Sequence, residues 1–137
     1  MSDSLPVYIL DSFAVLAYLE EEAGMEQVKA VLREATTGDC QVYVSLINLG
    51  EIVYIIEREQ SLQKAQETLA ALEQLPIQFL PASRQAILGA AHIKAQYPVA
   101  YADAFAIDAA ISQNGTVLTG DPEFETVEHL VNVSWLR

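Results

Sequence analysis

The chain has 137 residues, a mass of 15.0 kDa and 52% hydrophobic residues, enough for one domain with a substantial core. Its mean hydropathy of +0.22 excludes a disordered chain, and its longest uncharged stretch, residues 109–120, is shorter than the roughly 20 apolar residues of a membrane span. The net charge of −12 argues against a broad basic face for nucleic acid or anionic lipid.

The predicted elements alternate between short apolar runs and longer helical patterns, with no repeat or flexible linker, so we expect a single domain over residues 1–137. In chain order the expected strands are Val7–Leu10, Val42–Val44, Ile77–Leu80, Thr116–Leu118 and Val131–Val133. The expected helices are Ser12–Glu22, Met25–Ala35, Leu46–Glu59, Leu62–Leu75, Ser83–Gln96 and Ala100–Gln113. The almost continuously apolar strands and their alternation with helices predict a three-layer α/β/α sandwich with a parallel sheet of four or five strands.

The single cysteine, Cys40, cannot form an intramolecular disulfide, which suits a reducing cytoplasm. The first residues lack the basic start and apolar run of a secretory signal, and the last residues carry no lipidation motif. We therefore expect a cytoplasmic protein with no membrane association.

Two acids follow expected strands directly. Asp11 comes after the first strand and Asp121 after the fourth, and ligands of parallel sheets bind beyond the carboxyl ends of the strands. Asp is also a favoured N-cap, and Asp121-Pro122-Glu123 matches a cap, a proline at the first helical position and an acidic first turn. Capping therefore remains an alternative for each residue taken alone.

Two further acids lie on expected helices. Glu51 lies between Ile47 and Ile55 at a spacing of four, with no Lys or Arg one turn away. It therefore either faces water or needs a metal or a charged partner, because an unpaired buried carboxylate is costly. Asp103 begins a helix rich in small residues, where it either complements the helix dipole or approaches the strand ends.

Taken together, the four acids predict one carboxylate cluster at the edge of the sheet. Without cations such a cluster repels itself, and its pKa values rise. Oxygen ligands favour Mg²⁺ or Mn²⁺, and a pair of such ions is the usual device for phosphodiester hydrolysis. The residues alone therefore indicate a metal-dependent phosphodiesterase or phosphatase.

Two other protein classes with acids at strand ends do not fit this chain. A receiver-type phospho-acceptor needs a lysine at a later strand end, and this chain has none there. A haloacid-dehalogenase-type phosphatase needs a second Asp two residues after the first, where this chain has Phe13.

These motifs resemble those of PIN-domain ribonucleases, specifically the VapC-like toxins of bacterial and archaeal toxin–antitoxin pairs. The matching segments are Ile9-Leu10-Asp11-Ser12, residues 45–51, Tyr101-Ala102-Asp103-Ala104 and Leu118-Thr119-Gly120-Asp121. The resemblance covers essentially the whole chain and implies Mg²⁺- or Mn²⁺-dependent endonucleolytic cleavage of RNA. It implies that the catalytic and metal-binding residues are Asp11, Glu51, Asp103 and Asp121. It also implies supporting hydroxyls that orient a carboxylate or a metal-bound water, at Ser12, Ser45 and Thr119.

The resemblance further implies an RNA substrate, a cognate antitoxin protein and a homodimer. The apolar faces of residues 46–56 and 62–75 serve either as a dimer or antitoxin surface or as core. The chief departure from the family is charge, since few Lys and Arg are present to hold an RNA backbone. The alternative is a noncatalytic PIN-like module that binds protein, although retention of all four acids weighs against it.

Overall fold

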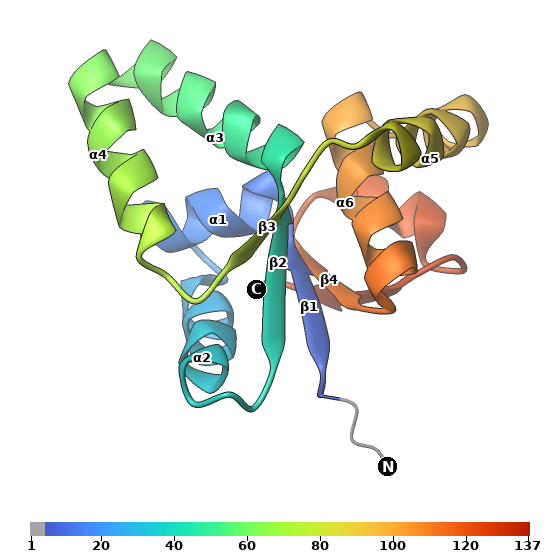
Figure 1. Ribbon diagram of the computed structural model, residues 1–137, viewed down its shortest axis with the longest axis horizontal. Helices are drawn as coiled ribbons and strands as arrows, with labels where there is room; N and C mark the ends of the chain where they lie inside the picture. The colour runs from blue at the N-terminus through green and yellow to red at the C-terminus, as the bar shows by residue number, and fades with distance from the viewer. Residues whose placement is uncertain (1–4) are drawn as a thin grey trace.

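A computed structural model describes residues 5–137 of the chain (Figure 1). Within these residues the strands are β1 (Val7–Leu10), β2 (Gln41–Ser45), β3 (Gln78–Leu80), β4 (Thr116–Thr119) and β5 (Asn132–Trp135). The α-helices are α1 (Ser12–Leu19), α2 (Met25–Thr36), α3 (Leu46–Glu59), α4 (Leu62–Glu73), α5 (Arg84–Gln96) and α6 (Tyr101–Gln113). A short 3-10 helix, η1 (Pro122–Val127), follows β4.

The strands form one parallel sheet in the order β3-β2-β1-β4-β5, which confirms the predicted fold class and fixes the number of strands at five. The chain adds β2 and β3 on one side of β1 and then crosses to add β4 and β5 on the other side. Ile9 of β1 is therefore flanked by Tyr43 of β2 and Val117 of β4. The strand order reverses at β1, so the carboxyl ends of β1 and β4 lie side by side at the position where such sheets bind ligands.

Helices cover both faces of the sheet, with α1 to α4 on one side and α5 and α6 on the other (Figure 1). Successive strand residues point to opposite faces, so Ile9 packs under α5 and α6, whereas Leu10 packs under α1 to α4. Each face thus has its own apolar core. The largest fully buried side chains of the two cores are Phe124, Ile9, Leu10, Ile52, Leu72, Ile107 and Leu118.

The first helix is shorter than its pattern predicts, because it ends at Leu19 rather than at Glu22. Three consecutive acids, Glu20 to Glu22, would place negative charge at the negative end of the helix dipole. Glu21 instead adopts a positive φ of 53°, which turns the chain toward α2. Cys40 is buried, and none of the helices in residues 5–137 is long and apolar enough to cross a membrane.

Helix η1 is anchored to the core by Phe124, which is fully buried against the α5–α6 side of the sheet. We expect Phe124→Ala to lower the free energy of unfolding by about 3–5 kcal/mol, because truncation of a buried aromatic leaves a cavity. Urea unfolding measures this loss, and Leu130→Ala, at a residue 38% exposed, is the control expected to change it by under about 0.5 kcal/mol. Equal losses in the two variants would contradict the placement of η1.

Candidate metal centre

Asp11 ends β1 and begins α1, and its carboxylate is held from two directions. Its Oδ1 accepts a hydrogen bond from the backbone N–H of Ala14 at 2.8 Å, so it is the N-cap that its sequence context allowed. Its Oδ2 accepts a hydrogen bond from the hydroxyl of Thr119 at the end of β4. Burial raises the pKa of Asp11 to about 7 despite both hydrogen bonds, and the negative charges of Asp121 and Glu51 raise it further.

Thr119 also fixes the loop that carries Asp121. The backbone N–H of Asp121 donates to the Thr119 hydroxyl oxygen at 3.0 Å, while that hydroxyl donates to Asp11. Asp121 in turn caps η1, because its Oδ1 accepts the backbone N–H of Glu123 at 2.9 Å. One buried hydroxyl therefore sets the positions of two carboxylates from strands that are 108 residues apart in the chain.

Asp103 lies in the first turn of α6 and is buried, with 8% of its surface exposed. Burial raises the pKa of Asp103 to about 8, with smaller contributions from the charges of Asp121 and Asp11 and from hydrogen bonds with Glu123 and Asp121. Ligand oxygens of Asp103, Asp121 and Glu123 lie within 4.8 Å of one another. We call these three residues the acidic trio.

Glu123 is a site residue that the sequence reasoning missed. Its Oε1 accepts the backbone N–H of Ala100 at 3.0 Å, which ties η1 to the start of α6. The pattern Asp121-Pro122-Glu123 predicts a helix start with an acidic first turn, and the structure has both. Glu123 lies two residues after Asp121, but only the approach of α6 places it beside Asp103.

Glu51, the fourth predicted acid, lies on α3 and is half-buried. Its charge raises the pKa of Asp11 and is the smallest of the contributions to that shift. Neither Glu51 nor Asp11 belongs to the acidic trio. The structure therefore brings Asp103 and Asp121 together, attaches Asp11 through Thr119, and leaves Glu51 at the margin of the site.

Of the three predicted supporting hydroxyls, that of Thr119 contacts Asp11, whereas those of Ser12 and Ser45 contact residues of α3. Ser12 donates to the backbone carbonyl of Asn48 at 3.4 Å and accepts from the Asn48 side chain at 3.2 Å. Asn48 also donates to the carbonyl of Ala102 at 3.2 Å, so it ties α3 to both α1 and α6. Asn48 was not predicted, and its buried Oδ1 has no partner. Ser45 caps α3 by accepting the backbone N–H of Ile47 at 3.1 Å and lines a cavity that contains none of the four predicted acids.

The donor set fits a hard divalent cation. Every donor of the acidic trio is a carboxylate oxygen, the ligand that Mg²⁺ and Mn²⁺ prefer. The groups that shift the pKa values of Asp11 and Asp103 include no basic residue, so nothing among them balances the negative charge. Acids that gather in this way gain from a cation, which lowers their pKa values and removes their repulsion.

The raised pKa values predict how pH changes the stability of the metal-free protein. The ordinary pKa of an Asp carboxyl is 3.8, and the folded protein raises it to about 7 for Asp11 and about 8 for Asp103. At pH values between 3.8 and these raised values, each side chain holds a proton in the folded state that the unfolded chain releases. Folding thus takes up protons, and the free energy of unfolding falls as pH rises through this window. At about 1.4 kcal/mol per pH unit for each group, the loss between pH 5 and pH 8 amounts to as much as about 7 kcal/mol.

Urea unfolding in EDTA at both pH values measures this loss. Asp103→Asn is expected to reduce the loss, because it removes one of the two titrating groups. Glu125→Gln, at an exposed acid on the same short helix, is expected to leave the loss unchanged. An Asp103→Asn variant with the wild-type pH dependence would contradict the assignment.

Comparisons with known proteins agree with the fold. In fold, the chain is similar to VapBC2 from Rickettsia felis bound to a promoter DNA fragment, with TM-score 0.74, 15% identity and coverage of 96% of this chain and 99% of that chain. It is similar to DNA-bound VapBC from Salmonella typhimurium, with TM-score 0.72, 18% identity and coverage of 96% and 98%. It is also similar to Mycobacterium tuberculosis VapC20, a sarcin-ricin loop cleaving toxin, with TM-score 0.68, 14% identity and coverage of 86% and 92%.

A comparison of the sequence with curated proteins finds no match. The sequence profile of the PIN domain, in contrast, matches residues 8–130 and so includes most of β1, all of β4 and every acid of the site. The solved structures share the fold across nearly the whole chain. The chain therefore belongs to the PIN domain family.

Proposed function

We propose that this chain is a Mg²⁺- or Mn²⁺-dependent endoribonuclease and the toxin of a toxin–antitoxin pair. The observation that carries the proposal is the group of Asp11, Asp103, Asp121 and Glu123, in which none of the groups that shift the pKa values of Asp11 and Asp103 is basic. A structural role does not require such a group, because each of these carboxylates raises the free energy of its neighbours. Membership of the PIN domain family supports the same activity.

The acidic trio would hold the cation, and Asp11 would contribute from its fixed position beside Thr119. A bound Mg²⁺ or Mn²⁺ supplies a water of lowered pKa and an electrophile for the phosphodiester oxygens. Thr119 keeps the Asp11 carboxylate in one orientation, and the N–H of Ala14 fixes its second oxygen. Glu51 adds negative charge at the margin, which attracts the cation to this edge of the sheet.

RNA is the substrate that the relatives support. VapC20 is described as cleaving the sarcin-ricin loop, and it shares this fold over 86% of the chain. The net charge of −12 leaves few basic residues for the RNA backbone, so the cation must first neutralise the acidic trio before phosphate can approach. We therefore expect RNA binding to depend on the divalent ion itself.

An antitoxin partner and a homodimer complete the proposal. Several solved relatives are VapBC assemblies, and one is described as a toxin–antitoxin complex from Klebsiella pneumoniae. Three large apolar side chains of the α3–α4 pair are exposed, Leu46 by 42%, Tyr54 by 51% and Leu62 by 55%. These side chains support the use of that helix pair as a protein contact surface in the cytoplasm, where the toxin would meet its antitoxin and its RNA.

Metal binding tests the site without knowledge of the substrate. We expect Mn²⁺ at 100 times its dissociation constant to stabilise the wild-type protein by about 2.7 kcal/mol, because the ion binds only the folded state. Asp11→Asn and Asp103→Asn are expected to lose most of this gain, because each removes a carboxylate from the site. Without metal, Asp103→Asn is expected to be no less stable than wild type, since it removes a repelling charge. Asp11→Asn is expected to lose about 1 kcal/mol, because an amide cannot accept hydrogen bonds from both Ala14 and Thr119. Thermal melting with and without Mn²⁺ measures both effects.

The two variants also separate specific binding from ion uptake by an acidic surface. If wild type and both variants gain equally from Mn²⁺, the acids are caps and surface charge, and a noncatalytic interaction module becomes the better account. If the gain is specific, cleavage of single-stranded RNA with Mn²⁺ is expected in wild type and is expected to fall at least about 100-fold in Asp103→Asn.

Glu123 provides a second test, with a matched control two residues away. Glu123→Gln keeps the size of the side chain but removes a charged ligand, so we expect the dissociation constant for Mn²⁺ to rise about 10-fold or more. Glu125→Gln on the same helix is expected to leave it unchanged, because Glu125 is exposed and lies outside the acidic trio. Calorimetric titration with Mn²⁺ measures both constants, and equal values would remove Glu123 from the site.

A further inference from the structure

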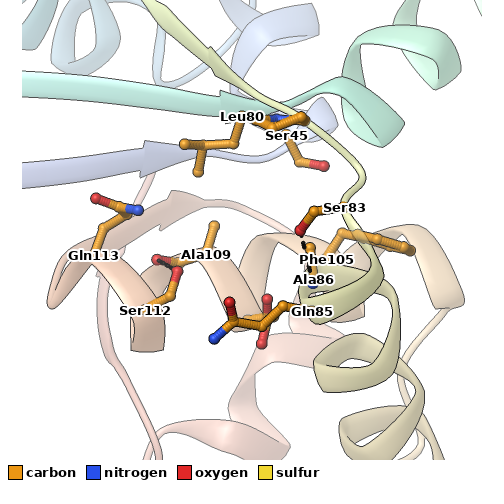
Figure 2. A pocket seen from close by; sticks show the side chains of 11 residues that line it. Ser45, Leu80, Ser83, Gln85, Ala86, Phe105, Ala109, Ser112 and Gln113 are labelled. Atoms are coloured by element: carbon orange, nitrogen blue, oxygen red, sulfur yellow. Dashed lines mark hydrogen bonds between the residues drawn. The ribbon is translucent and has the colours of Figure 1, made fainter.

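A cavity of about 410 Å³ lies between α5, α6 and the carboxyl ends of β2 and β3 (Figure 2). Ser45 and Leu80 end the two strands on one side, and α6 forms the other wall from Phe105 to Gln113. No member of the acidic trio lines it. The cavity opens at the carboxyl edge of the sheet, because Ser45 and Leu80 are the last residues of β2 and β3.

The lining of this cavity has no Lys, Arg or His, so it cannot hold a phosphate group by charge. Its apolar surface comes from side chains such as Leu80, Phe105 and Ala109. Its volume falls within the roughly 300–1,000 Å³ of small-ligand sites. The walls therefore suit a compact, uncharged group with polar atoms at its edge.

Asp108 is the one charged residue in the lining. It is half-buried where α5 crosses α6, and a β-carbon at Gly89 of α5 would stand 2.1 Å from its Oδ1. The Asp108 carboxylate therefore occupies space that is free only because residue 89 is a glycine. Burial raises the pKa of Asp108, with no hydrogen bond or neighbouring charge contributing to the shift. The ionised carboxylate can only accept hydrogen bonds, so it requires N–H or O–H donors from a ligand or water.

Two serines supply hydrogen-bond donors, in contrast to the Asp108 carboxylate, which only accepts. The Oγ atoms of Ser45 and Ser83 each accept a backbone N–H at 3.1 Å, from Ile47 and Ala86 respectively. Each hydroxyl therefore retains its own hydrogen to donate toward an acceptor. The carboxamides of Gln85 and Gln113 add groups that can donate or accept (Figure 2). The cavity thus calls for a ligand with both donors and acceptors at its edge.

We propose that this cavity binds an unpaired guanine base of the RNA substrate, with Asp108 accepting the N1–H and N2–H of the base; this inference rests on the proposed ribonuclease function. Guanine presents two adjacent N–H donors, which one carboxylate can accept together. Its O6 and N7 are acceptors for the hydroxyl and amide donors of the other wall. Proteins recognise single-stranded RNA in this way, by accepting splayed bases into pockets and reading their edges.

The guanidinium of a partner's arginine would also satisfy Asp108, since it offers paired N–H donors. Guanidinium has no acceptor, however, so the hydroxyls of Ser45 and Ser83 would find no partner on it. Adenine and cytosine offer one exocyclic amine, and uracil offers a single N–H beside two carbonyl oxygens that repel a carboxylate. Of these groups, guanine is the one that donates two adjacent N–H groups to Asp108 and also offers acceptors to the serine hydroxyls.

Cleavage of a randomised single-stranded RNA pool with Mn²⁺, followed by sequencing of the cut ends, tests the pocket. We expect wild type to require guanine at one fixed position relative to the cut. Asp108→Asn replaces one acceptor oxygen with a donor and is expected to reduce this preference about 10- to 100-fold. Glu67→Gln, at an exposed acid on α4, is the charge-matched control expected to keep it. Identical base preferences in Asp108→Asn and wild type would overturn the proposal.

A nucleotide-binding experiment tests the pocket independently of the nuclease activity. We expect guanosine 5′-monophosphate, but not adenosine 5′-monophosphate, to shift the side-chain amide NMR signals of Gln85 and Gln113 in wild type and not in Asp108→Asn. If the wild-type protein shows these shifts but cuts no RNA, the guanine pocket is supported and the proposed ribonuclease function is wrong. If it cuts RNA but neither nucleotide shifts the signals, or if methylguanidinium alone does so, the guanine pocket is wrong.

Discussion

The hydrogen bond from Thr119 to Asp11 is the interaction on which the geometry of the candidate metal centre depends. It joins the carboxyl ends of the two central strands, β1 and β4, and the same hydroxyl oxygen holds the backbone of Asp121. A threonine can do this because one hydroxyl both donates and accepts. The carboxylates repel one another, so such fixed polar contacts and the packing of the helices must hold them together when no cation is bound.

Much of the site could be predicted because it follows from strand endings. In a parallel sheet every carboxyl end lies at one edge, so an acid after β1 and another after β4 must be neighbours once those strands pair. The fold class follows from the same regularity, because almost continuously apolar strands alternate with helices. Asp103 was predictable for a related reason, since the alanines around it allow α6 to pack closely on the sheet.

The rest depends on contacts between elements that local patterns do not specify. Glu123 satisfies the local rule for an acidic first turn, so nothing in its neighbourhood reveals that the start of α6 approaches it. Asn48 bridges residues 36 and 54 positions away, which requires the full three-dimensional fold. Ser45 was expected beside the acids, but its hydroxyl caps α3 and borders the cavity between α5 and α6. Residues with a satisfied local role are the hardest to assign from sequence.

The pairing of β1 with β4 also affects the order in which the site is assembled during synthesis. Asp11 leaves the ribosome 108 residues before Thr119, which at about 5–20 residues per second is an interval on the order of 5–20 s. Until β4 has been made, neither Asp121 nor Glu123 exists, and the first half of the chain carries no complete site. Because of this topology, the candidate metal centre is completed only when nearly the whole chain has been synthesised.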